Sequence, residues 1–514
     1  MREAAIKEQK AYQRRLEYYR TSLKDNHIHM LAVDACMKSY NKNQSKNVAE
    51  HQKVREEIFV HVWLPVITEY VEWVLDEAIK SGKKRLYFLA RDGYMMYLMA
   101  EKIVRERKLE IELKYLKVSR FAIRNAEYFF IGKDALDTLC VGGIDITFEK
   151  IMKRANLTEE EGRHIARLTG RTETYKTPLN YRQLRKLKED LSRIELLFIY
   201  IKEHSKTCYE TTAAYLRQEG LLEPVSYAIV DSGWVGSLQL SLQRVLAHEA
   251  SRDIRLQGYY FGIYERPKGT DAEQYKAFYF GEKDVWKKVR FANCLFETVL
   301  SAPEGMTCGY GMMPDEKILN EIHSQAHVYT AFECDVKNPN AEILGRFSEL
   351  LSEYVSDYIE AAYVESAANI TSAAESLESS VSTESSVVLE TLVDNLTVIH
   401  KSKKKSVRFV ARLLEPMMGN PTMQEAKAFG ELLFCDDVLE LNLQSVAAMW
   451  DEEQLRENRF LYKVLNKLNL KPAGLNESAW PEGSIARLGI KTEMNMRQQR
   501  LYKSLMYIRK AVCK

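Results

Sequence analysis

The stretch KKRLYFLARDGYMMYLMAEKIVRERK, residues 83–108, decides the fold of this chain. A largely apolar run over residues 85–90 predicts a short buried strand, and an acidic turn at 91–93 ends it. Apolar residues then recur at helical spacing over 94–107, which predicts an amphipathic helix. The segment IELKYLKVSR, residues 111–120, alternates as a strand does. The whole region is therefore predicted to be a β-α-β unit.

The same design returns in VSYAIVDSGWVGSLQLSLQRVL, residues 225–246. An apolar strand is predicted over 225–230, an acidic, glycine-containing turn over 231–236 and an amphipathic helix over 237–246. The apolar segment IRLQGYYFGIY, residues 254–264, predicts a further strand. Because strands that alternate with helices form parallel sheets covered on both faces, the sequence predicts an α/β fold with a Rossmann-like parallel sheet.

The 514 residues are enough for two or three domains, because single cores usually stop growing well before that length. Helical patterns flank and interrupt the α/β region, and Pro65 is expected to start, kink or break a helix in the first of them. The predicted organisation is an N-terminal helical segment (1–82), a Rossmann-like α/β domain (83–315) with a helical insertion (about 143–220), a helical stretch (316–364), a Ser/Glu-rich linker or solvated helix (365–390) and a mainly helical C-terminal domain (391–514).

The charge balance argues against a nucleic-acid partner. Lys and Arg number 74 and Asp and Glu 72, so no global positive field would hold the chain on nucleic acid. The eight cysteines include no CxxC pair and are expected to be reduced, mostly buried thiols. The charged N-terminus lacks the apolar core of a secretory signal, and the apolar run at 196–201 is far shorter than the roughly 20 residues that cross a bilayer. We therefore expect a cytoplasmic protein with no transmembrane segment.

Two acidic residues stand where the ligand of a parallel sheet is expected. Asp92 and Asp231 each follow a predicted strand and precede a predicted helix. In open parallel sheets the ligand lies beyond the carboxyl ends of the strands, where helix N-termini direct free N–H groups at it. Gly93, Gly233 and Gly236 would let the backbone come close to such a ligand. We expect a small polar ligand here, and the alternative is that both segments are ordinary acidic turns.

The side chains around the two turns indicate the class of ligand. Asp92 and Asp231 would repel a bare phosphate, so together they are predicted to hold Mg²⁺ or sugar hydroxyls, with Asp231 as the first choice and Asp92 as the second. Arg91, Arg120 and Arg124 would supply bidentate contacts to a phosphate group. The expected ligand is therefore a phosphorylated small molecule or sugar.

Three further residues are candidates for ligand contact. Ser237, at the start of a predicted helix, would cap that helix or hydrogen-bond a phosphate oxygen. Trp234 would stack on a sugar or base, or else belong to the core. Glu297 opens the segment ETVLSAPEGMTCGY, residues 297–310, which is predicted to pass from helix to loop. That segment would form a wall of the site, or else simply end a helix.

With FLARDGY (88–94), VDSGWVGSLQ (230–239) and ETVLSAPEGMTCGY (297–310), the chain resembles a bacterial family described as predicted hydrolases of the haloacid-dehalogenase (HAD) superfamily. The resemblance covers about residues 50–310, with a fainter match at AWPEGSIARL near Trp480. Members are often encoded among genes for surface-polysaccharide synthesis, and some are fused to glycosyltransferases. The resemblance implies Mg²⁺-dependent hydrolysis of a phosphate ester by an aspartate nucleophile. It also implies a phosphorylated or nucleotide-linked sugar as substrate and a glycosyltransferase as partner.

Two alternatives remain open, because the superfamily's nucleophile is the first Asp of a DxD pair whose second Asp is the general acid. Here Asp92 precedes Gly-Tyr and Asp231 precedes Ser-Gly, so neither is followed by that second acid. One alternative is a phosphoribosyltransferase-like enzyme, in which ARDG (90–93) is the pyrophosphate loop and VDSGWVGS (230–237) the ribose-phosphate loop. The other is a catalytically degenerate module that binds or assembles beside a glycosyltransferase.

Overall fold

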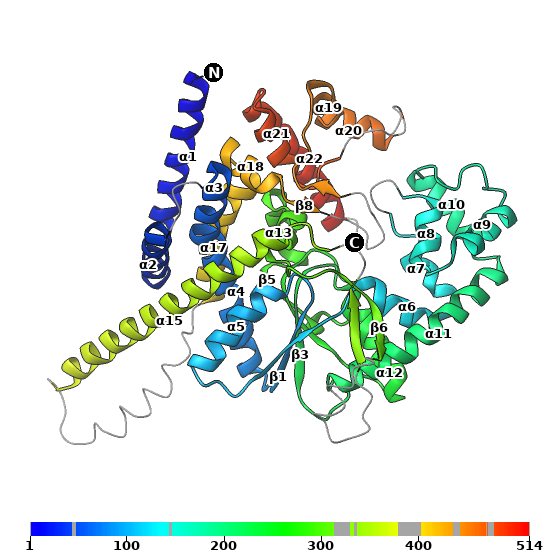
Figure 1. Cartoon of the computed structure of the whole chain (residues 1–514), viewed down its shortest axis with the longest axis horizontal. Coiled ribbons are helices and arrows are strands. Elements are labelled where there is room, and N and C mark those ends of the chain that lie inside the picture. Colours follow the sequence, from blue (N-terminus) through cyan, green and yellow to red (C-terminus); the bar gives the residue numbers. More distant parts are fainter. Residues whose placement is uncertain are drawn as a thin grey trace.

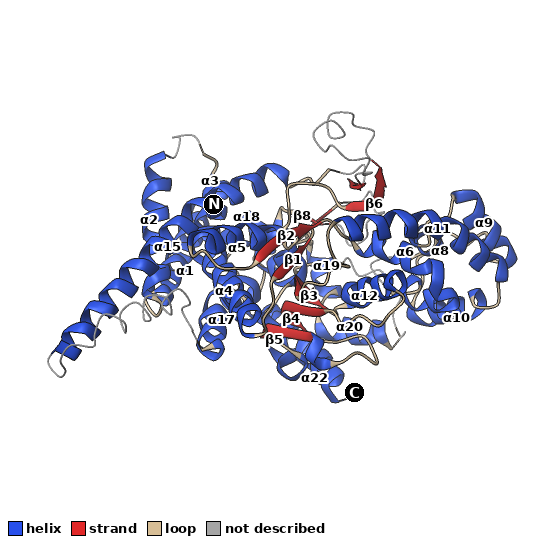
Figure 2. Ribbon diagram, turned by 90° about the horizontal axis from the view of Figure 1, so that it is seen from below, coloured by secondary structure: helices blue, strands red, loops and turns tan. Residues whose placement is uncertain are grey.

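A five-stranded parallel sheet lies at the centre of the computed structural model, with helices packed on both of its faces (Figures 1 and 2). The predicted α/β class with a Rossmann-like parallel sheet is therefore confirmed. The strands of the sheet are β1 (Arg85–Leu89), β2 (Glu112–Leu116), β3 (Tyr227–Trp234), β4 (Gln257–Ile263) and β5 (Tyr275–Phe280). The structure describes residues 2–43, 48–142, 146–312, 329–333, 337–378, 402–434, 443–468, 470 and 477–512.

Alternation along the strands explains why the sheet is buried on both faces. Leu86 and Phe88 of β1 belong to the core on one face, and Tyr87 and Leu89 belong to the core on the other. Successive side chains of a strand point to opposite faces, so an unbroken apolar run is fully buried only between two layers. The covering helices are α4 (Leu64–Lys80) and α5 (Tyr94–Glu106) on the first face, and α6 (Arg120–Ile131), α11 (Glu195–Gln218) and α12 (Ser237–Ala250) on the second (Figure 2).

The strand order creates a crevice at one position of the sheet. The order is β2-β1-β3-β4-β5, and every neighbouring pair is parallel. The chain passes from β1 outward to β2 and then returns to the other side of β1 as β3. The order therefore reverses between β1 and β3. In open α/β sheets, ligands bind beyond the carboxyl ends of the strands at such a switch point.

The N-terminal segment is helical where it is described, as predicted. A π-helical turn, η1 (Phe59–Trp63), lies directly before Pro65, the second residue of α4. In an α-helix the carbonyl of His61 would accept a hydrogen bond from the N–H of residue 65. Because Pro65 has no N–H, this hydrogen bond is absent, and the helix widens there. Of the start, kink or break expected at Pro65, the structure shows the start of α4 at Leu64 within one continuous helical run, Glu50–Lys80. The helices that precede η1 are α1 (Arg2–Leu23), α2 (His27–Asn43) and α3 (Glu50–Ile58).

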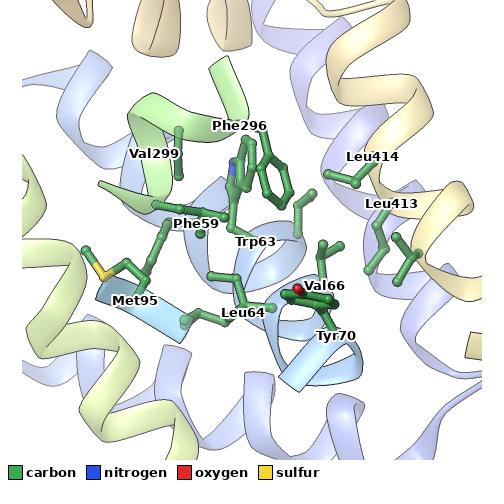
Figure 3. Packing of buried hydrophobic residues seen from close by; sticks show 14 of the residues in the cluster. Phe59, Trp63, Leu64, Val66, Tyr70, Met95, Phe296, Val299, Leu413 and Leu414 are labelled. Carbon is green, nitrogen blue, oxygen red and sulfur yellow. The ribbon is translucent and has the colours of Figure 1, made fainter. Parts of the chain in front are cut away.

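The helical run Glu50–Lys80 is long and apolar enough, by length and composition alone, to cross a membrane. However, 89% of its most apolar window is buried inside the molecule. Phe59 stacks on Phe347 with ring centroids 3.9 Å apart. Trp63 packs against Phe296, as Figure 3 shows. This burial is that of a core helix and is compatible with a soluble protein.

The helical insertion forms a lobe at the right of Figure 1. Its buried residues, among them Phe148, Ile165 and Leu187, form a hydrophobic cluster of their own. The predicted insertion at about 143–220 is helical where it is described, and helices already begin at Arg120, directly after β2. The remaining elements of the lobe are η2 (Gly132–Ala135), α7 (Leu136–Leu139), α8 (Phe148–Arg154), α9 (Glu159–Leu168) and α10 (Tyr181–Leu191).

The C-terminal helices pack directly against the N-terminal ones. The Tyr19 hydroxyl of α1 donates to the Glu425 carboxylate at 2.7 Å, and Arg55 of α3 donates to the Ala428 carbonyl at 2.7 Å. Buried residues of both regions belong to the same hydrophobic cluster as one face of the sheet. The helices are α15 (Ala341–Glu378), α17 (Lys403–Gly419), α18 (Met423–Gly430), α19 (Glu452–Glu457), α20 (Phe460–Lys467), α21 (Pro481–Leu488) and α22 (Thr492–Val512).

One prediction about the segment between these regions needs correction. The stretch 316–364, predicted to be helical, contains strand β7 (Tyr329–Glu333), which pairs antiparallel with β6 (Thr307–Met312). The segment 365–390, predicted as a linker or a solvated helix, is helical as far as the end of α15, and residues 379–401 lie outside the described part of the chain. The remaining elements are η3 (Ala272–Gln274), η4 (Glu282–Arg290), α13 (Asn293–Leu300), β8 (Leu433–Phe434) and β9 (Gln444–Ser445).

Among the described cysteines, one differs from the predicted reduced state. Cys36 is a buried free thiol, Cys140 and Cys208 are half-buried free thiols and Cys294 is half-buried, so most of these side chains are less buried than predicted. Cys308, on β6, is disulfide-bonded, and its partner lies outside the described residues. The prediction that every cysteine is reduced is therefore wrong at Cys308. Sequence spacing did not indicate this bond because tertiary structure, not local spacing, decides which distant cysteines meet.

A candidate ligand site at the switch point of the sheet

A cavity of about 400 Å³ opens at the carboxyl ends of β1 and β3, where the strand order reverses. We call it the switch-point cavity. Residues from α6, α12 and α13 close its sides, together with the segments 337–340 and 433–434. The predicted site residues that line it are Arg91, Asp92, Arg120, Asp231, Gly233, Trp234, Gly236, Ser237 and Glu297.

Asp92 lies in the turn between β1 and α5 and is half-buried. The Ser232 hydroxyl of the neighbouring strand donates to Asp92 Oδ2. The turn is tight, since the Gly93 N–H donates to the Leu89 carbonyl at 2.9 Å and a Cβ on Gly93 would lie 2.4 Å from that carbonyl oxygen. Gly93 is not among the described lining residues, so the turn itself requires this glycine, contrary to the prediction that it faces a ligand.

Asp231 lies inside β3, contrary to the predicted turn at 231–236, because β3 continues to Trp234 alongside β4. Only 8% of Asp231 is exposed. Its Oδ1 accepts the Ser232 N–H at 2.9 Å, and its backbone carbonyl accepts the Tyr70 hydroxyl at 3.0 Å. Backbone and side chain of Asp231 are therefore both fixed in the wall of the cavity.

Glu297 reaches the cavity from α13 and is held by Trp234. The Trp234 indole N–H donates to Glu297 Oε1 at 2.5 Å. The indole ring packs among the rings of Phe280, Phe291 and Phe296. Of the two interpretations of Trp234, the structure favours the core residue. Its polar edge also fixes the orientation of the Glu297 carboxyl group in the cavity.

Burial and mutual repulsion raise the pKa of two of the three carboxyl groups. Burial, followed by the charges of Asp92 and Glu297, raises the pKa of Asp231 well above its ordinary value. Burial, followed by the charge of Asp92, raises the pKa of Glu297 to about 7. Arg120 opposes both shifts. The cavity therefore holds a protonated carboxyl group near neutral pH, and such a group is able to donate a proton.

Positive groups meet at the same cavity. Arg91 and Arg120 line it, and Arg124 donates to Ser237 Oγ at 3.1 Å from α6. Helix α12 begins at Ser237 with Gly236 as its N-cap, and no side chain of the described residues caps it. Ser237 is thus the first helical residue, which corrects its predicted capping role. Free N–H groups at a helix N-terminus beside guanidinium groups favour an anion such as phosphate.

The polar wall formed by Asn338 and Asn340 has no counterpart in the sequence predictions. Asn338 Nδ2 donates to the Ala302 carbonyl at 2.6 Å. Asn340 Nδ2 donates to the Leu433 carbonyl at 2.8 Å, and its Oδ1 accepts the Leu433 N–H at 3.0 Å. An Asn-Pro-Asn sequence marks a turn, but no local pattern indicates that this turn reaches a cavity beside β1 and β3.

Asp92 and Asp231 are the two residues predicted to hold Mg²⁺. Within the described ranges, no three His, Cys, Asp or Glu side chains are grouped as a metal site. Mg²⁺ is often bound by one or two carboxylates together with waters and substrate phosphates. Two aspartates that line one cavity therefore fit a Mg²⁺ ion that binds together with a phosphate ligand, and this assignment is part of the proposal below.

Comparison with known proteins does not indicate a function for this chain. No protein-family model and no curated protein matches the chain. The resemblance to the HAD-type hydrolases therefore stays a prediction, and the fold by itself does not determine a function.

Proposed function

We propose that the chain is a hydrolase whose switch-point cavity binds a phosphorylated small molecule and cleaves its phosphate ester. One observation carries the proposal: Asp92, Asp231 and Glu297 line the same cavity as Arg91 and Arg120. Carboxyl groups supply a nucleophile and a proton donor, and arginines bind the phosphate. The HAD resemblance supports the same activity and extends it to a phosphorylated or nucleotide-linked sugar of surface-polysaccharide metabolism, beside a glycosyltransferase.

Asp92 is the proposed nucleophile because it is more exposed than Asp231. Its carboxylate attacks the phosphorus atom, and the bond from phosphorus to the leaving oxygen breaks. Protonated Glu297 gives its proton to that oxygen, which leaves as an alcohol. Water then attacks the phosphoaspartate and gives a proton to the Glu297 carboxylate. Inorganic phosphate leaves, or a nucleoside diphosphate when the substrate is a nucleotide-linked sugar, and both carboxyl groups return to their starting state.

Asp231 is the proposed positioning carboxylate. Its hydrogen bonds with Ser232 and Tyr70 hold it in place, and with Asp92 it would hold Mg²⁺. The charge of that ion would oppose the burial and repulsion that raise the pKa of Asp231. Mg²⁺, when bound, neutralises charge on the phosphate. Neither Asp92 nor Asp231 is followed by the second Asp of a DxD pair. In this proposal Glu297 is the general acid in its place. Its pKa of about 7 supports that role, because an effective general acid has a pKa near the operating pH.

A phosphoribosyltransferase-like reaction is the second candidate, and one observation favours it. The acidic end of β3 leads through Gly233 and Gly236 to the N-terminus of α12, which would suit a ribose phosphate. A scaffold without activity has no need to bring three carboxyl groups into one cavity. The grouping therefore favours an enzyme over the degenerate module.

The test uses thermal unfolding and product analysis with Mg²⁺ and a panel of sugar phosphates, nucleotide sugars and phosphoribosyl pyrophosphate. A ligand at 100 times its Kd stabilises a protein by about 2.7 kcal/mol. We expect a sugar phosphate or nucleotide sugar to stabilise the wild type and to be hydrolysed, and Asp231→Asn to weaken both effects. Glu349→Gln, an exposed change on α15, is the matched control.

Each other outcome favours a different function. Pyrophosphate release from phosphoribosyl pyrophosphate would favour the second candidate. Stabilisation without any product would favour the binding module. If no ligand stabilises the wild type, the proposal of a phosphate-ester site is contradicted.

A further inference from the structure

A second cavity, of about 360 Å³, lies between η4 and the C-terminal helices α20 and α22. Basic and aromatic side chains characterise its lining, and we call it the lysine–tyrosine cavity. These side chains are Lys288, Lys463, Lys503, Tyr264, Tyr502 and Tyr507. Tyr264 also lines the switch-point cavity, so the two cavities share a wall.

Lys288, with 6% of its surface exposed, lines the lysine–tyrosine cavity next to Tyr264. Its Nζ donates at 2.5 Å to Asn293 Oδ1, and Asn293 lines the switch-point cavity. The same Nζ lies 4.4 Å from the ring centroid of Tyr264 and 5.8 Å from that of Tyr507. It also lies 5.6 Å from the ring centroid of Trp234 in the switch-point cavity. One buried cation therefore contacts residues of both cavities.

A similar arrangement recurs at Lys463 in the lysine–tyrosine cavity. Lys463, which is 8% exposed, donates to Gln499 Oε1 at 3.3 Å. Its Nζ lies 5.0 Å from the ring centroid of Tyr502. Two buried ammonium groups in one cavity thus each lie over a tyrosine ring and bind an amide oxygen. A phosphate oxygen would accept from either ammonium group in place of that amide oxygen.

The charge of the cavity is net positive. Against the three lysines, its described lining has one glutamate, Glu477. Lys503 lies 2.6 Å from the carboxylate of Glu482, which is outside the lining, so this pair is close to neutral. Lys288 and Lys463 together still exceed the charge of Glu477. An anionic ligand is therefore favoured over a neutral or cationic one.

The tyrosines indicate that the anion also carries a planar ring. Ring faces stack on nucleobases regardless of sequence, and lysines pair with phosphates. The amide groups of Asn458 and Gln499 add donors and acceptors for the edge of a base. The volume lies within the range of small-molecule sites. A bare phosphate has no ring that could stack on the tyrosines. An apolar ligand would bury the lysines without a counter-charge.

We propose that the lysine–tyrosine cavity binds the nucleoside of a nucleoside diphosphate and its first phosphate, and that the second phosphate passes Lys288 into the switch-point cavity. This inference deepens the proposed function and rests on it for the bond that is cleaved. It names the substrate class as a nucleotide-linked sugar rather than a simple sugar phosphate. Binding of the nucleoside diphosphate is measurable without any turnover.

The test is calorimetric titration of the full chain with uridine, guanosine and adenosine diphosphates, and with inorganic pyrophosphate as the ring-less control. We expect at least one nucleotide to bind about tenfold or more tightly than pyrophosphate. Lys463→Met is expected to weaken that nucleotide about tenfold or more, because a hydrogen bond to a charged group is lost, and Lys463→Arg to restore most of the affinity. Lys404→Met, an exposed change on α17 that lines neither cavity, is expected to leave the affinity unchanged.

The inference is overturned if none of the three nucleotides binds or if pyrophosphate binds as tightly as they do. It is also overturned if Lys463→Met unfolds at the wild-type temperature and binds the nucleotide with wild-type affinity. The comparison of nucleotide with pyrophosphate uses the wild type, so it holds even where a variant does not fold. Hydrolysis of sugar phosphates without nucleotide binding would remove only this inference. Nucleotide binding without hydrolysis of any ester would remove only the proposed function.

Discussion

The two strand-to-helix junctions, β1 to α5 and β3 to α12, are alike in sequence and differ in structure. Asp92 lies beyond its strand and is half-buried, whereas Asp231 lies within its strand with 8% of its surface exposed. Pairing decides the difference, because β3 pairs with β4 as far as Trp234 while the pairing of β1 ends at Leu89. One acidic motif thus produces an accessible carboxylate suited to react and a buried carboxylate suited to position a ligand.

The largest expected effect separates these two aspartates by their kinetics. Asp92→Asn removes the proposed nucleophile and is expected to lower kcat by at least about 10³-fold. Asp231→Asn leaves the nucleophile in place and is expected to cost about 10- to 100-fold, largely in the affinity for Mg²⁺ and phosphate. Steady-state kinetics on the best substrate measures both variants. Equal losses in kcat would remove the distinction between the two junctions.

Glu297→Gln tests whether Glu297 is the proton donor that acts together with Asp92 and Asp231. We expect kcat to fall by about 10² to 10⁴-fold for an alkyl phosphate, whose leaving oxygen needs a proton. The loss should be much smaller for nitrophenyl phosphate, whose leaving group departs as an anion. With the wild type, kcat for the alkyl phosphate should fall as the pH rises through about 7, because Glu297 loses its proton. Equal losses for the two substrates would contradict the proton-donor role.

The buried carboxyl group of Glu297 should also make stability depend on pH. The folded-state pKa of Glu297, about 7, exceeds its ordinary value of 4.5, so folding favours the protonated form. The stability that this provides is present in full below about pH 4.5 and is lost as the pH rises through about 7. At 1.36 kcal/mol per pKa unit the loss is about 3 kcal/mol.

Urea unfolding of wild type and Glu297→Gln, between pH 5 and pH 8 with a chelator present, measures this dependence. Glutamine does not titrate, so the free energy of unfolding of the variant should rise relative to that of the wild type as the pH increases. Glu349→Gln, whose side chain is exposed on α15, should keep the wild-type dependence. Parallel pH curves for wild type and Glu297→Gln would show that burial does not shift this carboxyl group.

The smallest expected effect is electrostatic coupling across the site. After burial, the charge of Asp92 is the largest cause that raises the pKa of Glu297, so Asp92→Asn should lower that pKa below about 7. Trp234 donates its indole N–H to Glu297, so its fluorescence should report the protonation of that carboxyl group. Subtracting the titration of Trp234→Phe removes the fluorescence of the other tryptophans and leaves the signal of Trp234. An unchanged midpoint in Asp92→Asn would show that the two carboxyl groups do not interact.

The sequence predicts the strands of the sheet and the acidic residues that follow them because both depend on local patterns. The apolar runs at 85–90 and 225–230 require a covering layer on each face, and they form β1 and the first half of β3. Parallel strands end at the same edge of a sheet, so Asp92 and Asp231 meet there whatever the loops between them do. Their presence in one cavity therefore follows from the strand order.

The rest of the site depends on packing between distant segments, which no local pattern specifies. The Asp-Ser-Gly sequence after position 230 is typical of a turn, but pairing with β4 extends the strand to Trp234. The hydrogen bond from Trp234 to Glu297 exists because α13 packs beside β3. Asn338 and Asn340 reach the cavity only because the start of α15 lies beside the end of α13.

The central claim is that the carboxyl groups of the switch-point cavity cleave a phosphate ester, and one assay tests it most directly. Hydrolysis of the best alkyl-type substrate is measured with Mg²⁺ at pH 6 and pH 8 for wild type and Asp92→Asn. The account predicts faster turnover by the wild type at pH 6 than at pH 8, and almost none by Asp92→Asn at either pH. Turnover by Asp92→Asn at the wild-type rate would contradict it.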